Sequence, residues 1–190
     1  MNFSEEDHAA ALPEQMARIP YIDPEQAPEP IREVFEVAPP LNIFKTLAHA
    51  ETAFRPFMRF GGAILTRLEL DPVLRELAIL QVARQCEAEY EWVQHVAIGQ
   101  SVGITDEQIA ALEGGDVEAD VFDGAQRALL IFTRAVVAGP RVTDQTFASL
   151  KQHLSDREVV ELLMTIGEYW MLARVMTVLG VDVEPPAGLR

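Results

Sequence analysis

A cluster of polar side chains lies mid-chain, in the segment CEAEYEWVQH at residues 86–95. On a helix, Glu91 and His95 lie one turn apart and face the same way. A carboxylate beside an imidazole orients the ring and favours its charged form, which suits a general acid or base near neutral pH. Alternatively, Glu89 and Glu91 are solvated residues of a first helical turn, favoured by the helix dipole, and His95 is only half-buried.

Glu76 is a second candidate because its helical neighbours are apolar. Burying a carboxylate is costly unless it is paired. Glu76 is therefore either an acid–base group, the partner of an arginine, or a residue at the edge of the apolar stripe. The neighbours three, four and seven positions away include Pro72, Val73, Ile79, Leu80 and Ala83.

The path of the chain between Glu76 and His95 decides whether they share one site. On one continuous helix they would lie about 28 Å apart, at 1.5 Å per residue. A reversal around residues 85–88 would instead let the two side chains meet. No glycine or proline marks this turn, so the local sequence leaves both arrangements open.

Several common catalytic motifs are missing from the sequence. It has no glycine-rich phosphate loop, no HExxH and no CxxC, and its 4 histidines lack the spacing of metal ligands. We therefore expect no metal and no cofactor. Cys86 is the single cysteine, which excludes an intrachain disulfide and favours a reducing compartment.

The elements that must position these side chains are predicted to be helices. Asp71 followed by proline marks one helix start, and capping boxes mark two others at Thr105 and Ser155. No segment alternates with the strand period, so the predicted fold class is all-α. The expected helices span residues 31–38, 42–50, 52–67, 72–86, 89–102, 105–113, 123–138, 143–153 and 156–179.

Two of these helices, 72–86 and 156–179, are apolar around most of their circumference. This pattern predicts burial on two sides, either within the domain or across a subunit contact. The protein is thus expected to oligomerise through helix packing.

Length and composition predict one soluble domain. The chain has 190 residues, 49% apolar, with a proline-rich arm at 1–29, a helical domain at 30–184 and a short tail at 185–190. In the arm, Ile19, Tyr21 and Ile22 could dock on the body or on a neighbouring subunit.

Charge and hydropathy exclude several classes of partner. A net charge of −15 disfavours binding to nucleic acid and to anionic lipid. The N-terminal segment MNFSEEDHAA lacks the apolar core of a secretory signal, and no run of apolar residues is long enough to span a membrane. We expect a cytoplasmic protein with a small-molecule substrate.

The block RELAIL…AEYEW..H at residues 75–95 resembles the carboxymuconolactone decarboxylase family, which shares an all-helical fold with alkylhydroperoxidase D. The resemblance extends from RIPYIDPEQAPEPIREVFE to GEYWMLARVMTVLGV. In the peroxidase branch of this family the site has the order E…CxxCxxxH. The resemblance implies that Glu76 and His95 occupy the glutamate and histidine positions, that Ala88 and Glu91 occupy the cysteine positions, and that the chain reverses between the two helices.

Because this chain lacks the cysteine pair, we do not expect thiol peroxidase activity of that type. Ala88 and Glu91 supply neither a reactive thiolate nor a resolving thiol, and Cys86 is two residues out of register. The resemblance then implies a cofactor-free lyase or isomerase, a carboxy-lyase acting on a small carboxylated unsaturated ring compound of the aromatic-degradation type. Loss of CO₂ leaves an electron pair that delocalises into a carbonyl group, and the enzyme must deliver a proton to carbon.

The residues predicted to carry this chemistry are His95 as general acid, Glu91 as the group that holds it, and Glu76 as a second acid–base or orienting group. Because the substrate is an anion, a cation must offset these carboxylates; the candidates are Arg75, Arg84 and Arg174. The remaining predicted pocket residues are Glu89, Tyr90, Trp92 and Arg174.

Other interpretations remain open. On the last long helix, Glu168, Tyr169 and Arg174 form either a pocket wall or an interhelical or subunit contact. The chain could be a thiol-dependent antioxidant protein that uses Cys86 alone, or a non-catalytic helical oligomer that binds a small hydrophobic ligand. The family resemblance implies a homo-oligomer, a trimer or a hexamer.

Overall fold

The computed structural model describes residues 17–186. All regular elements in this range are helices and no strand forms there, which confirms the all-α prediction. In chain order the helices are α1 (Glu29–Phe35), α2 (Asn42–Leu47), α3 (Glu51–Arg67), α4 (Pro72–Gln85), α5 (Glu89–Val102), α6 (Asp106–Glu113), α7 (Gly124–Ala138), α8 (Asp144–Lys151) and α9 (Asp156–Leu179).

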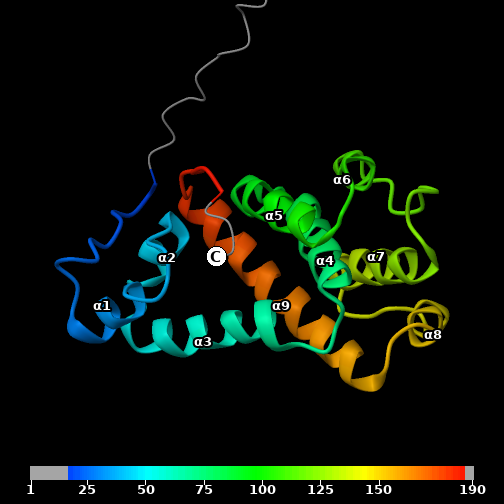
Figure 1. The fold of residues 1–190 in the computed structure, drawn as a ribbon, viewed down its shortest axis with the longest axis horizontal. Coiled ribbons are helices and arrows are strands. Elements are labelled where there is room, and N and C mark those ends of the chain that lie inside the picture. The colour runs from blue at the N-terminus through cyan, green and yellow to red at the C-terminus, as the bar shows by residue number, and fades with distance from the viewer. Residues whose placement is uncertain (1–16, 187–190) are drawn as a thin grey trace, which may run out of the picture.

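Helix α4 is the centre of the fold. It packs against α5, α7 and α9, and Figure 1 shows it between α5 and α9. Asp71 caps its start by accepting hydrogen bonds from the backbone amides of Val73 and Leu74. The side chains of Leu77, Leu80 and Val82 are completely buried. The predicted burial of this helix on two sides is therefore satisfied within one chain.

Helix α9 crosses the molecule diagonally and touches both of its halves (Figure 1). It packs against α3, α4 and α7. Among the described residues it is the one helix long and apolar enough to cross a membrane by length and composition alone, although the sequence predicted no membrane span. The core helix of a soluble protein also meets this criterion; α9 contacts α4, and 39% of its apolar window is buried.

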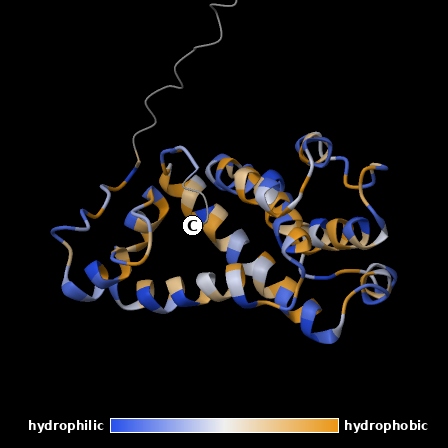
Figure 2. Ribbon diagram, in the orientation of Figure 1, coloured by the Kyte–Doolittle hydropathy of each residue, from blue (hydrophilic) through white to orange (hydrophobic). Residues whose placement is uncertain are grey.

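Helices α1, α2 and α3 lie on the opposite side of α9 from α7 and α8 (Figure 1). They enclose a small apolar cluster of their own, around Ile31, Val34 and Phe54. Figure 2 shows apolar residues along the inner faces of these helices and polar residues outside. This half of the molecule is held to α9 largely through α3.

The predicted arm packs on the body where the structure describes it. Residues 1–16 of the arm and 187–190 of the tail lie outside the described range. The hydroxyl of Tyr21 donates to Oδ2 of Asp182 at 2.7 Å, and the backbone amide of Arg18 donates to the carbonyl of Leu179 at 2.8 Å. Tyr21 and Ile22 pack on apolar clusters of the same chain.

The reversal between α4 and α5 is made without glycine. Glu87 has a φ of 54°, in the left-handed region. The amide of Ala88 donates to the carbonyl of Ala83 at 2.9 Å and that of Glu87 to Arg84 at 3.3 Å, which is a Schellman ending. The sequence could not predict this turn because a residue other than glycine adopts the strained conformation, at a cost of about 1 kcal/mol.

Replacement of Glu87 by glycine should therefore raise the free energy of unfolding by about 1 kcal/mol, since glycine adopts positive φ without strain. Urea denaturation followed by circular dichroism measures this change. Glu87→Ala is the matched control, because alanine keeps the strain and should give no such gain. A destabilised Glu87→Gly protein would contradict the strained turn.

Candidate active site

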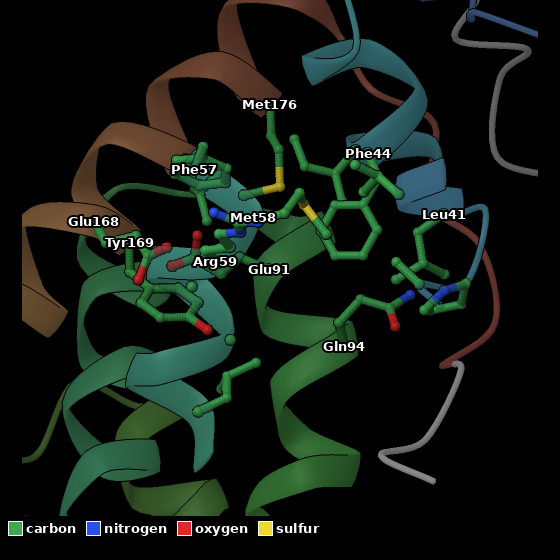
Figure 3. A pocket seen from close by; sticks show the side chains of 18 of the residues that line it. Leu41, Phe44, Phe57, Met58, Arg59, Glu91, Gln94, Glu168, Tyr169 and Met176 are labelled. Carbon is green, nitrogen blue, oxygen red and sulfur yellow. The ribbon is translucent and has the colours of Figure 1, made fainter. Parts of the chain in front are cut away.

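A cavity of about 530 Å³ lies between α1–α3 on one side and α5 and α9 on the other. Figure 3 shows the apolar side chains of Phe44, Met58 and Met176 at one part of its wall. The carboxyl groups of Glu91 and Glu168 gather at another part, beside Tyr169. The cavity is thus mostly apolar, with two carboxyl groups close together in its wall.

His95 lines this cavity and is held from behind by α4. Its Nδ1 lies 2.7 Å from Oε2 of Glu76, whose Oε1 accepts a hydrogen bond from Nε of Arg75 at 3.0 Å. All three side chains are buried, and Glu76 is fully so. Nδ1–H donates to the carboxylate, which leaves Nε2 as the ring nitrogen available to a ligand.

The meeting of Glu76 and His95 confirms the chain reversal that the resemblance implied. The expected support of His95 by Glu91 is not observed: neither carboxyl oxygen of Glu91 has a hydrogen-bond partner within the described residues. The ring of His95 turns toward α4 instead, where the guanidinium of Arg75 offsets the charge of Glu76. Of the three options left open for Glu76, pairing with an arginine is observed.

Glu91 and Glu168 form a pair of acids in the cavity wall. Burial, followed by the nearby charge of Glu168, raises the pKa of Glu91 well above its usual range. Burial raises the pKa of Glu168 to about 7. A methyl group on Gly61 would lie 2.8 Å from Oε1 of Glu168, so this glycine leaves the space that the carboxyl group occupies.

Two tyrosines complete the polar part of the wall. The ring of Tyr169 meets His95 edge-on, with 4.8 Å between ring centroids. Glu168 and Tyr169 thus lie in a pocket wall, the first of the two placements left open above. The hydroxyl of Tyr90 donates to Oε1 of Glu184 at 2.5 Å, and the same oxygen accepts from the amide of Asn42 at 2.6 Å. Glu184, the last residue before the tail, thereby joins α2 to α5.

The arginines of the cavity come from α3, which the sequence did not indicate. Arg55 and Arg59 both line it; Arg55 pairs with Glu33, whereas Arg59 has no ion pair or hydrogen bond within residues 17–186. The three arginines predicted to serve an anionic substrate lie elsewhere. Arg75 is buried beside Glu76, Arg84 donates to the carbonyl of Glu113, and the exposed Arg174 lies over the ring of Trp170.

Three other residues singled out from the sequence do not line the cavity. Glu89 is exposed in the first turn of α5, as the alternative interpretation proposed. Trp92 is half-buried and packs on the main apolar core. Cys86 is buried, and burial raises the pKa of its thiol. No group of side chains suited to a metal ion occurs among the described residues.

This arrangement can transfer protons. It offers an imidazole oriented by a buried carboxylate, two carboxyl groups with raised pKa values and a single unpaired arginine. The sequence did not single out Arg55 and Arg59 for the site. The available signal was their spacing of one helical turn, which places both on one face of the helix.

The raised pKa of Glu168 has a consequence for stability. Above pH 4.5, its ordinary pKa, the Glu168 carboxyl group ionises in the unfolded chain but keeps its proton in the folded chain until about pH 7. The contribution of Glu168 to stability is therefore complete below pH 4.5 and is lost as the pH rises through about 7. Glu168→Gln should therefore melt several degrees higher than the parent at pH 8 and at the same temperature at pH 5.

Thermal unfolding followed by circular dichroism at both pH values tests this expectation. Glu107→Gln, an exposed change on α6 outside the cavity, is the matched control and should melt like the parent at both. Equal melting of Glu168→Gln and the parent at pH 8 would show that the Glu168 carboxyl group is not destabilised by burial.

Comparison with known proteins finds one family model that matches part of the chain. Residues 51–135 match the model of the carboxymuconolactone decarboxylase family, a span that contains Glu76, Glu91 and His95. A search of curated proteins found no match.

Solved structures resemble the chain in fold. The alkylhydroperoxidase AhpD core of a peroxidase-related protein from Ralstonia eutropha JMP134 is 23% identical, covers 88% of this chain and 92% of its own, and has a TM-score of 0.77. A peroxidase-related protein from Silicibacter sp. TM1040 is 18% identical, with the same coverages and a TM-score of 0.76.

The debrominase Bmp8, in complex with 2,3,4-tribromopyrrole, is 16% identical, covers 89% of this chain and 94% of its own, and has a TM-score of 0.72. At these identities the likeness concerns the fold. The resemblance drawn from the sequence is confirmed: residues 51–135 carry the pattern of the carboxymuconolactone decarboxylase family, on an AhpD-like fold and without a CxxC pair.

Proposed function

We propose that the protein is a cofactor-free enzyme that uses His95 to transfer a proton to a small, unsaturated, carboxylated ring compound. Decarboxylation of a lactone of the carboxymuconolactone type is the reaction that fits best. The observation that carries the proposal is the hydrogen bond of 2.7 Å between His95 Nδ1 and Glu76 Oε2 at the wall of an apolar cavity.

The proton balance of this reaction fits His95. Cleavage of the bond between the ring carbon and the carboxylate releases CO₂ and leaves an electron pair, which delocalises into the lactone carbonyl as a dienolate. The dienolate carbon then takes a proton from Nε2 of the imidazolium. Nδ1–H remains hydrogen-bonded to the carboxylate of Glu76 throughout. The carboxylate therefore stabilises the charged ring and fixes its orientation.

The size and lining of the cavity support a small ring substrate. A volume of about 530 Å³ falls in the range of small-molecule sites. Phe44, Phe57 and Leu172 supply apolar walls. The structural neighbour Bmp8 binds a brominated pyrrole, also a small unsaturated ring, in a protein of similar fold.

Thiol chemistry has less support, although two structural neighbours are described as peroxidase-related. The described lining of the cavity contains no cysteine. Cys86 is buried and the pKa of its thiol is raised, which lowers the fraction of reactive thiolate. Its single thiol is consistent with the cytoplasmic location that we propose.

His95→Ala should keep the fold and lower turnover of 4-carboxymuconolactone by about 100-fold to 10,000-fold, the usual contribution of a general acid. Loss of substrate absorbance measures turnover. Glu76→Gln should lower turnover too, and it should also reduce stability because the buried Arg75 loses its counter-charge.

The matched control is His153→Ala, because this exposed histidine lies outside the cavity. Full activity in both His95→Ala and Glu76→Gln would remove the proton-transfer assignment. Binding of the lactone that raises the melting temperature without any conversion would favour the non-catalytic ligand-binding alternative.

We also propose that the chain forms a homo-oligomer through α9. Apolar side chains recur on this helix at helical spacing and are 41–56% exposed in the single chain, an unusual amount of apolar surface for an isolated subunit. They are Val160, Leu163, Met164, Trp170, Met171 and Val178.

Leu163→Glu should shift the protein from oligomer to monomer in size-exclusion chromatography with light scattering, because burying the new charge is costly. Val121→Glu is the matched control: Val121 is 42% exposed, similar to Leu163 at 41%, but lies outside α9. A parent protein that elutes as a monomer would exclude this assembly.

A further inference from the structure

Glu91 is buried in an unusual state. Its side chain is only 2% exposed, it lines the cavity, and both of its carboxyl oxygens lack a hydrogen-bond partner within the described residues. An ionised carboxylate in such a place would carry a large desolvation cost. The carboxyl group of Glu91 is therefore either neutral or the hydrogen-bond partner of a ligand.

Glu168 faces the same region from α9. It is 5% exposed, and its Oε2 also lacks a partner in the described part of the chain. The charge of Glu168 acts directly on Glu91, and Figure 3 shows the two carboxyl groups on the same side of the cavity. Two carboxyl groups so placed oppose each other's ionisation.

The arginines around this pair of acids are either paired with another carboxylate or exposed. The guanidinium of Arg75 pairs with Glu76, and that of Arg55 with Glu33. Arg59 lines the cavity but is exposed, and the charges that act on Glu91 and Glu168 include no arginine. The titratable or charged groups on the helices around the pair are Arg55 and Arg59 of α3, Arg75, Glu76 and the adjoining Cys86 of α4, Tyr90 and His95 of α5, and Tyr169 and Arg174 of α9.

We propose that Glu91 and Glu168 bind the ligand as neutral carboxylic acids, donating hydrogen bonds to a carbonyl or enolate oxygen, while Arg59 binds the ligand's carboxylate. This inference rests on the proposed function and extends it, since the oxygen that they bind is the one on which charge develops during decarboxylation. A neutral acid stabilises that charge without repelling the anion.

The neutral state removes the conflict that a site rich in carboxyl groups poses for an anionic ligand. Glu76 is balanced by Arg75, Glu33 by Arg55, and the two remaining acids carry protons. Arg59 is then the one uncompensated charge among the described residues that line the cavity. The electrostatics of the cavity favour an organic anion over an organic cation.

The experiment uses the whole protein and the probe 4-acetylbenzoate, which carries a carboxylate at one end and a ketone oxygen at the other. Calorimetry at pH 5.5 and pH 8.5 measures its affinity. Infrared spectroscopy of the probe with a ¹³C-labelled ketone reports hydrogen bonds to that oxygen. Benzylammonium, an aromatic cation of similar size, is the opposing probe.

We expect the parent to bind 4-acetylbenzoate about tenfold more tightly at pH 5.5 than at pH 8.5, which corresponds to about 1.4 kcal/mol for the hydrogen bonds lost on ionisation. The ketone band should shift to lower frequency at pH 5.5. Benzylammonium should not bind at either pH.

The glutamine variants separate a neutral donor from a charged acceptor. The double variant Glu91→Gln and Glu168→Gln keeps amide N–H donors and cannot ionise, so it should bind 4-acetylbenzoate equally at both pH values. Glu91→Ala removes a donor and should weaken binding at pH 5.5 and reduce the shift of the ketone band. Arg59→Gln should weaken binding about equally at both, and Glu107→Gln should change nothing.

Benzylammonium binding that strengthens with pH and disappears in the glutamine variants would overturn the inference, because the pair would then act as charged carboxylates. Affinity for 4-acetylbenzoate that is independent of pH in the parent would overturn it as well. Neither outcome depends on turnover. If the lactone is not converted while the binding results hold, the proposed function fails and this inference stands.

Discussion

The buried contact between Glu76 and His95 is the interaction on which the rest of the site depends. Glu76 sits on the most deeply buried helix of the fold, and its carboxylate is divided between Arg75 and His95. Because a buried charge without a counter-charge is strongly destabilising, the three side chains have to be placed together. The reversal between α4 and α5 brings His95 of α5 next to Glu76 of α4.

That reversal also explains what could be predicted from the sequence. The helices were predictable because their ends carry caps that act locally: Thr105 and Ser155 form the expected capping boxes, and Gly103 and Gly180 end α5 and α9 in left-handed conformations. The turn at Glu87 was not, because nothing about glutamate signals positive φ. Only the family resemblance indicated that the two helices meet.

The composition of the site shows the same division. Spacing along α5 placed Glu91 and His95 on one side of the helix, but it could not show that a carboxyl group from α4 would take the hydrogen bond. Nor could it show that α3 lies across the cavity and contributes Arg55 and Arg59. Which helix faces which is set by long-range packing, and one sequence carries no local signal for it. Glu168 lies outside the matched span 51–135, and the sequence left its place in a pocket wall as one of two alternatives.

Glu184, which follows α9, connects parts of the molecule that are remote in sequence. Through one carboxyl oxygen it binds both the amide at the start of α2 and the hydroxyl of Tyr90, and its backbone carbonyl accepts from Gln94. One side chain after α9 therefore holds α2 and α5, two walls of the cavity, together. Separating the start of α2 from α5 means breaking both hydrogen bonds to this oxygen, so removal of the Glu184 carboxyl group would loosen two walls of the cavity from a position remote in sequence.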